Sequence, residues 1–223
     1  MTRQAIAAAY ENLGMTIVGS SLWFLIGFTP LFFFVGVLVR TWSLWLSLPF
    51  LLVVIFTFGP ATVGVHALLE PLVWREDNPI GTTTREYFRG FRRYYWQSVG
   101  LVALNGLLVA ILAVDIGFFA TRSEFLMRSL AVIWLYILLF QLVVANFYFP
   151  FLIRQRLGPL AAVKKSALFV LDNPGISFAV SAEILVLFAV SVVLPVLLFV
   201  LFMGVAAFVQ AYAFKAVMRR YQD

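Results

Sequence analysis

Glu183 is the first residue of this 223-residue chain to consider for chemistry, because it is the only charged residue between Ile176 and Phe214. By helical rise it would lie roughly 10–12 Å along a helix that begins at Ile176. A carboxyl group at that depth in a membrane is costly unless it is protonated, paired or in contact with water. Two interpretations follow. Glu183 is either an acidic site of a transporter or a neutral hydrogen-bonding group between helices.

Amide side chains are the other polar groups inside the apolar stretches. Such groups hydrogen-bond between membrane helices and contribute about 0.6–2 kcal/mol each. Together with Glu183, three of them make up a candidate intramembrane polar site: Asn105, Asn146 and Gln210. Gln141 has the same capacity.

His66 and Glu70 stand one helical turn apart, a spacing that suits a proton-accepting pair. Counted from Leu44, however, both residues fall near the end of an apolar stretch. That position favours a capping or boundary role over proton transfer.

Residue types that are missing exclude several kinds of chemistry. The chain has no cysteine, which excludes disulfides and thiolate sites, and a single histidine, which argues against a zinc site. The sequence contains neither a glycine-rich phosphate loop nor a nucleophile-and-base arrangement, so an ATPase role is excluded. We therefore expect a protein that is not an enzyme and needs no cofactor or metal.

Composition places these residues in a membrane. The chain is 63% hydrophobic and 12% charged, whereas soluble domains carry about 25% charged residues. Apolar runs of this length can cross a bilayer core of ~30 Å, and a proline at 195 divides the last run, which would otherwise be too long. We predict one all-α membrane domain over 1–223, a polytopic transmembrane bundle with six spans at about 13–39, 44–69, 99–119, 130–151, 176–194 and 196–214.

Two polar segments are expected to lie along the membrane surface as amphipathic helices, at about 83–97 and 159–172. The first starts with a capping box, Thr83 to Glu86, and sets an aromatic face against an arginine face. Such a helix places rings at the acyl boundary and cations at anionic headgroups. The functional interpretation is lipid sensing or partner docking, and the simpler one is membrane anchoring with charges that set topology. The candidate contacts are Arg85, Arg89, Arg92, Arg93, Lys164 and Lys165.

The distribution of positive charge predicts the orientation. Alternate sides of the six spans carry thirteen and three Lys or Arg residues, and the richer side includes both ends of the chain. The richer side is normally cytoplasmic, so both termini are expected in the cytoplasm. Because topology accounts for the basic residues, we do not expect binding to nucleic acid.

The connection between the second and third spans carries a family resemblance. It combines Gly59-Pro60-Ala61-Thr62, then Tyr87-Phe88-Arg89-Gly90-Phe91-Arg92, then Gln97-Ser98, with Asn173-Pro174 before the fifth span. This pattern resembles the YesL-like family of bacterial membrane proteins, a domain-of-unknown-function family. The resemblance implies a location in the bacterial inner membrane. It also implies a carbohydrate-uptake context, since members are often encoded beside carbohydrate ABC transporters.

Two functions are expected from these observations. The first is a non-enzymatic accessory or assembly subunit of a transport system, which contacts another membrane protein through its surface helices. The second is a small-solute or proton-coupled transporter with a cavity near Glu183. A wet cavity lined by Glu183 and the amides would favour transport, and a sealed core with an exposed apolar flank would favour a subunit.

Overall fold

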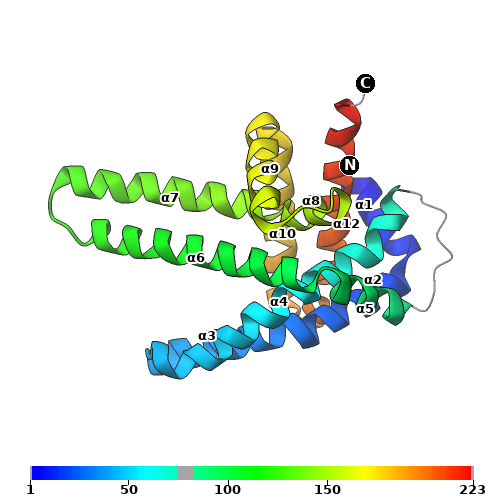
Figure 1. Ribbon diagram of the computed structural model, residues 1–223, viewed down its shortest axis with the longest axis horizontal. Coiled ribbons are helices and arrows are strands. Elements are labelled where there is room, and N and C mark those ends of the chain that lie inside the picture. Colours follow the sequence, from blue (N-terminus) through cyan, green and yellow to red (C-terminus); the bar gives the residue numbers. More distant parts are fainter. Residues whose placement is uncertain (1, 75–82, 222–223) are drawn as a thin grey trace.

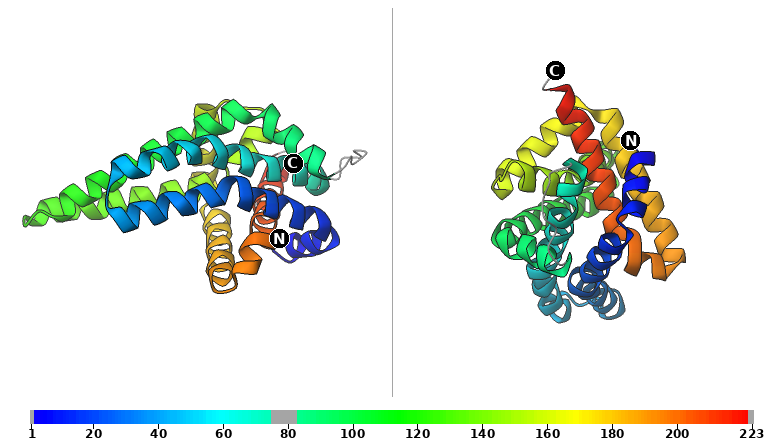
Figure 2. Two further views of the ribbon diagram at one scale, coloured as in Figure 1. Left: turned by 90° about the horizontal axis from the view of Figure 1, so that it is seen from below. Right: turned by 90° about the vertical axis from the view of Figure 1, so that its right-hand side faces the viewer.

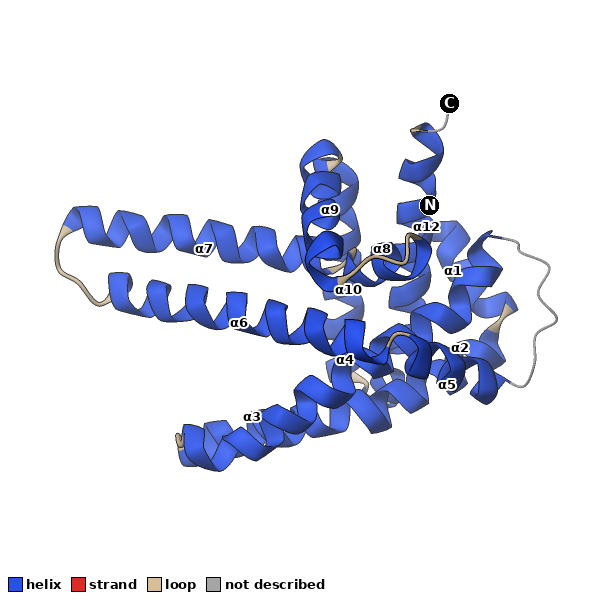
Figure 3. Cartoon of the chain, viewed as in Figure 1, coloured by secondary structure: helices blue, strands red, loops and turns tan. Residues whose placement is uncertain are grey.

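The computed structural model describes residues 2–74 and 83–221, apart from the side chain of Leu44. Every regular element in these residues is a helix (Figure 3). Six helical segments are long and apolar enough to cross a membrane. The all-α prediction and the number of spans are confirmed, and the protein is an integral multi-pass membrane protein.

The first span begins after a short N-terminal helix, α1 (Thr2–Glu11), that the sequence analysis did not anticipate. The span itself consists of α2 (Leu13–Trp23), a π-helical turn η1 (Phe24–Phe28) and α3 (Thr29–Thr41). The π turn lies just before Pro30, where the helix must accommodate a residue that cannot donate a backbone hydrogen bond.

The second span, α4 (Leu44–Trp74), is longer than the expected 44–69. Its end was predicted at the first charged residue, Glu70. The helix continues because its last turn is packed inside the protein: Leu69 and Val73 are buried, and the Val73 carbonyl accepts a hydrogen bond from Lys215.

The prediction of a surface helix at 83–97 is wrong about the length of that helix. Helix α5 (Thr83–Arg93) ends earlier, and α6 (Tyr95–Ala120) forms the third span, which therefore starts before the expected 99. Tyr94 adopts a non-helical conformation between them, with its side chain buried. The residues at 95–97 thus belong to the span and not to the surface helix.

Helix α5 also packs against the protein more closely than a helix lying only on lipid. The Tyr87 side chain is fully buried, and its hydroxyl donates to the Ala61 carbonyl of α4 at 3.1 Å. Gly90 allows α5 to approach α4 because an added Cβ would collide with that of Ala67. Tyr87, which belongs to the aromatic face predicted to contact lipid, therefore anchors α5 inside the protein instead.

The fourth span is interrupted. Helix α7 (Phe125–Ala145) is followed by a break at 146–147 and by α8 (Tyr148–Arg154), so the segment extends beyond both ends of the expected 130–151. Helix α9 (Pro159–Asp172) covers the range expected for the second amphipathic helix.

The last apolar stretch turns at Pro195, as expected. Helix α10 (Pro174–Val193) precedes the turn, and α11 (Pro195–Leu197), the π-helical η2 (Leu198–Phe202) and α12 (Met203–Arg220) follow it. Helix α12 continues past the expected end at 214 because its last turns are also covered: Lys215 and Val217 are buried.

Helices α4 and α12 form the centre of the molecule, with α8 packed against both and α1 beside α12 (Figures 1 and 2). Two hairpins, α3 with α4 and α6 with α7, extend to one side, with their turns far from both chain ends (Figure 1). The outer parts of these hairpins are largely exposed, whereas Val63, Phe208 and Phe214 are buried in the centre.

Candidate functional site

Glu183 lies away from the amides with which the sequence grouped it. On α10, its Oε1 accepts a hydrogen bond from the Thr2 hydroxyl at 2.5 Å, and its Oε2 is buried without a hydrogen-bond partner among the described residues. The side chain therefore joins α10 to the start of α1. Since α1 was not anticipated, this partner could not be foreseen.

The three amides of the candidate site do come together. Asn105, Asn146 and Gln210 line a cavity of about 260 Å³, and Ile184, not Glu183, represents that part of α10 in its wall. Asn146 lies at the break between α7 and α8, where the interrupted span turns its side chain toward α10 and α12.

Hydrogen bonds between side chains occupy these amides. Asn146 donates to Ser181 at 3.0 Å and accepts from Gln210 at 3.1 Å. Gln141 donates to Asn105 at 3.0 Å and to the Tyr148 hydroxyl at 2.5 Å. The network joins four spans, and such bonds hold membrane helices together. The cavity wall is otherwise mostly apolar, and no charged residue lines it among those that the structure describes.

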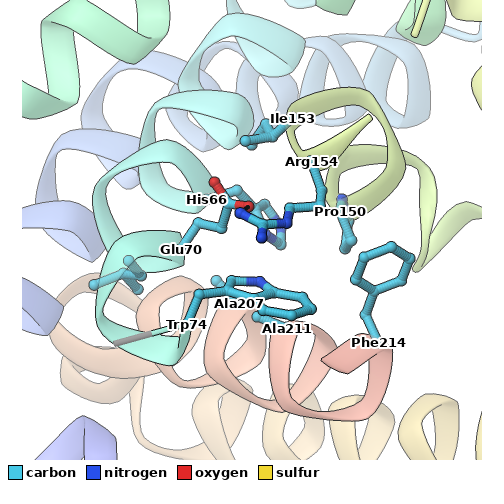
Figure 4. Close-up of a pocket in the computed structure, with 10 residues that line it drawn as sticks. His66, Glu70, Trp74, Pro150, Ile153, Arg154, Ala207, Ala211 and Phe214 are labelled. Atoms are coloured by element: carbon cyan, nitrogen blue, oxygen red, sulfur yellow. Dashed lines mark ion pairs between the residues drawn. The ribbon is translucent and has the colours of Figure 1, made fainter. Parts of the chain in front are cut away.

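A second polar cluster lies where α4, α8 and α12 meet (Figure 4). His66, Glu70 and Trp74 share one face of α4, and Arg154 of α8 reaches both of the latter. Its guanidinium lies 4.2 Å from the Trp74 ring centre and 3.7 Å from the Glu70 carboxylate. Lys215 of α12 also approaches this cluster, with its Nζ 5.4 Å from the centre of the same ring.

The expected His66–Glu70 pair is thus part of a larger arrangement. Glu70 faces Arg154, and His66 stacks on the Phe149 ring and lies next to Gln210. Trp74 was not predicted as part of this cluster, although its spacing of four from Glu70 places both residues on the same face of α4. Arg154 and Lys215 lie on helices far from α4 in the sequence, so no local sequence pattern predicts their contact with Trp74.

The predicted basic contacts divide into two groups. Arg89 and Arg93 line a polar pocket of about 340 Å³ together with Arg154 and Arg156, whereas Arg85 and Arg92 do not line it. On α9, Lys165 donates to Gln155 at 2.6 Å. Neither Lys165 nor its neighbour Lys164 lines the arginine pocket.

The connection that carries the family resemblance includes α4, α5 and the start of α6. Residues 38–116 match the family described as protein of unknown function, DUF624. The YesL-like resemblance is therefore confirmed over this segment, which runs from the end of α3 to the last turns of α6. No curated protein and no solved structure matches the chain. The DUF624 match covers both the anchoring of α5 and two of the pocket's four arginines.

Proposed function

We propose that this DUF624 protein is a non-enzymatic accessory or assembly subunit of a transport system in the bacterial inner membrane. Its termini would face the cytoplasm, an orientation supported by the charge count of thirteen against three. The hairpin turns that carry the fewer basic residues lie far from both chain ends, as this orientation requires (Figure 1).

The outward face of α6 carries the proposal. Small residues recur on it at alternating spacings of three and four, and all are exposed: Ala103, Gly106, Ala110, Ala113 and Gly117. A Cβ added to either glycine would meet no described atom within 4 Å. Beside this seam runs an exposed row of bulky residues: Leu107, Ile111, Val114 and Phe118.

A groove beside a ridge is the surface that a second membrane helix fits. Lipid tails are as apolar as the side chains, so membrane helices associate through close packing, and small residues permit it. The exposed part of α3 differs, since it presents large side chains that include Phe32, Phe33 and Val39. We therefore assign the α6 face to a helix of another membrane protein and the α3 face to lipid.

The YesL-like resemblance supports our proposal that this partner is a membrane-embedded subunit of a carbohydrate uptake system. The transporter alternative has the amide cavity in its favour. However, Glu183 lies outside that cavity and is hydrogen-bonded to Thr2. The acidic group and the amides therefore do not form the single wet site that the alternative needs.

The test compares two sets of glycine substitutions in protein purified from native membranes. Gly106→Leu with Gly117→Leu fills the α6 seam, and Gly36→Leu is the matched control because Gly36 of α3 also faces open space. The wild type and the control should retain the same transport subunit, identified by mass spectrometry. The double variant should lose it by about tenfold or more, a change of about 1.4 kcal/mol in association.

Two results would contradict the proposal. One is equal retention of the partner by the double variant and the control. The other is solute transport by the purified chain alone in liposomes, which would support the transporter alternative.

A further inference from the structure

The polar pocket beside α5 is a distinct feature, separate from the α6 face and independent of the proposed partner. It lies between α5 and the end of α8, over the last turns of α4, and has a volume of about 340 Å³. Small-ligand sites typically range from about 300 to 1,000 Å³. The pocket is therefore large enough for a compact ligand.

The walls of the pocket are held in place by packing. Gly90 and Ala67 bring α5 against α4, the Tyr87 ring packs on Gly64 of α4, and Tyr94 is buried just after α5. On the opposite wall, Ile153 is buried and anchors the turn that leads to Arg156. Arg156 has a φ of 50°, a left-handed conformation that a side-chain-bearing residue adopts at a cost of about 1–2 kcal/mol.

Charge is concentrated in this space. Four arginines and two glutamates line it: Arg89, Arg93, Arg154, Arg156, Glu70 and Glu86. Glu86 pairs with Arg89 at 2.6 Å, and Glu70 faces Arg154 at 3.7 Å. Arg93 and Arg156 form no ion pair with a described residue. The described lining residues therefore carry two more positive than negative charges.

An excess of two guanidinium groups from opposite walls suits a doubly charged oxyanion. The guanidinium fork donates paired hydrogen bonds that match phosphate geometry, and such charge-assisted bonds are about twice as strong as neutral ones. The ion pairs already present would orient Arg89 and Arg154 at the rim. A monoanionic diester would leave one positive charge uncompensated.

We propose that this pocket binds a dianionic phosphate group, the terminal phosphate of a phosphomonoester. The same chemistry is offered by a lipid headgroup, as in phosphatidic acid, and by inorganic phosphate. Arg93 and Arg156 are the residues that would grip the phosphate from opposite sides. This differs from a general attraction of α5 to anionic membranes, because Arg85 and Arg92 on the same helix would take no part.

The experiment uses the full chain in nanodiscs and a matched pair of double variants. Arg93→Gln with Arg156→Gln removes the two pocket arginines that form no ion pair with a described residue, and Arg85→Gln with Arg92→Gln removes two exposed arginines outside the pocket. Both variants lose two positive charges, so general electrostatics change equally. Binding is measured as the shift in thermal unfolding, at constant ionic strength set with chloride.

Two probes distinguish the sources of the phosphate. In phosphatidylcholine nanodiscs, inorganic phosphate is titrated. In a second series, phosphatidic acid replaces part of the phosphatidylcholine, with phosphatidylglycerol as the monoanionic control lipid. Phosphatidic acid should stabilise the wild type more than phosphatidylglycerol does. The Arg93/Arg156 variant should bind at least about tenfold more weakly, because the loss of one charge-assisted hydrogen bond is enough to lower affinity by that factor. The affinity of the Arg85/Arg92 variant should change by less than about twofold.

A response to phosphatidic acid alone supports a lipid ligand, and a response to inorganic phosphate supports a pocket open to soluble phosphates. Equal losses in the two variants would overturn the proposal, as would equal stabilisation by the two anionic lipids without a response to inorganic phosphate. So would the absence of any response to both probes in the wild type.

Discussion

Glycines of α4 are covered by neighbouring helices of the same chain, whereas glycines in the outer part of α6 face open space. In α4, a Cβ added to Gly59 would lie 2.5 Å from the Ser98 carbonyl oxygen, and one added to Gly64 would lie 2.9 Å from the Tyr87 ring. In α6, Gly106 and Gly117 face open space. Both helices cross the membrane in adjacent parts of the DUF624 segment. A Cβ added to Gly100, near the start of α6, would lie 3.2 Å from the Pro159 ring, so only the outer part of α6 leaves its glycines uncovered by the described chain.

The difference separates intramolecular packing from a surface left for another helix. The close approaches at α4 show what small residues achieve here: Gly59 lets the backbone of α6 come close, and Gly64 makes room for the Tyr87 ring of α5. In the outer part of α6, Gly106 and Gly117 have no such neighbour among the described residues. Substitutions at the α4 glycines should therefore destabilise the isolated protein. Substitutions at Gly106 and Gly117 of α6 should leave the isolated protein stable and weaken its complex with a partner.

The largest effect on the isolated protein is expected for Tyr87→Ala. It removes the ring that covers Gly64 and leaves a cavity between α5 and α4, at a cost of about 3–5 kcal/mol. Thermal unfolding in detergent measures this change. A matched substitution of an exposed aromatic on the same helix, Phe88→Ala, should cost far less. Similar losses for the two variants would mean that α5 is not anchored through Tyr87.

Gly59→Ala is expected to have the next largest effect. Its methyl group would press against the backbone of Ser98, which cannot move aside as a flexible side chain could. Overpacking of this kind costs about 1–3 kcal/mol. A lower unfolding temperature is the expected readout, and an unchanged one would show that α4 and α6 can separate without loss.

The phenol of Tyr87 should also give the protein a pH dependence. Burial raises the pKa of Tyr87 above its ordinary value of about 10. The unfolded chain therefore loses this proton first, so the contribution of Tyr87 is complete below about pH 10 and declines above it.

Tyr87→Phe isolates that contribution. At neutral pH it should cost about 1 kcal/mol through the lost hydrogen bond to Ala61. Above pH 10 the wild type should lose stability more steeply than the variant, by up to about 1.4 kcal/mol per pH unit. Unfolding curves from pH 7 to 11 that remain parallel would contradict a buried, protonated phenol.

The smallest effect is expected for Gly106→Ala and Gly117→Ala. With nothing in contact, the added methyl groups should leave the isolated protein unchanged or raise its stability by about 0.5–1 kcal/mol each through helix propensity. Gly36→Ala should behave alike. A clear destabilisation at 106 or 117 alone would mean that the α6 face is already occupied within the chain.

The elements that were predictable are those governed by hydrophobicity and proline. Six spans, the turn at Pro195 and the helix over 159–172 followed from apolar length and local breakers. The end of α4 did not, because Glu70 and the turn after it are held by Arg154 and Lys215 from far along the chain. The end of α5 was missed for a similar reason: Tyr94 is buried, and no local pattern marks that contact.

The candidate site shows the same limit. Asn105, Asn146 and Gln210 line one cavity, as expected of amides that must find polar partners inside a membrane, whereas their role as a site stays a prediction. Glu183 was placed with them by the same logic but found a partner in Thr2 on the unanticipated α1. The arginines of α5 looked equivalent in sequence, and only the position of α8 separates Arg89 and Arg93 from Arg85 and Arg92.

Photo-crosslinking from α6 in native membranes is the most direct test of whether a helix of another membrane protein packs on the exposed α6 face. The chain lacks cysteine, so Gly106→Cys and Gly36→Cys each provide one attachment point for a thiol-directed photoreactive probe. We expect a specific crosslink to an integral transport subunit from position 106 and lipid adducts alone from position 36. Lipid adducts alone from both positions, or the same protein crosslinked from both, would contradict it.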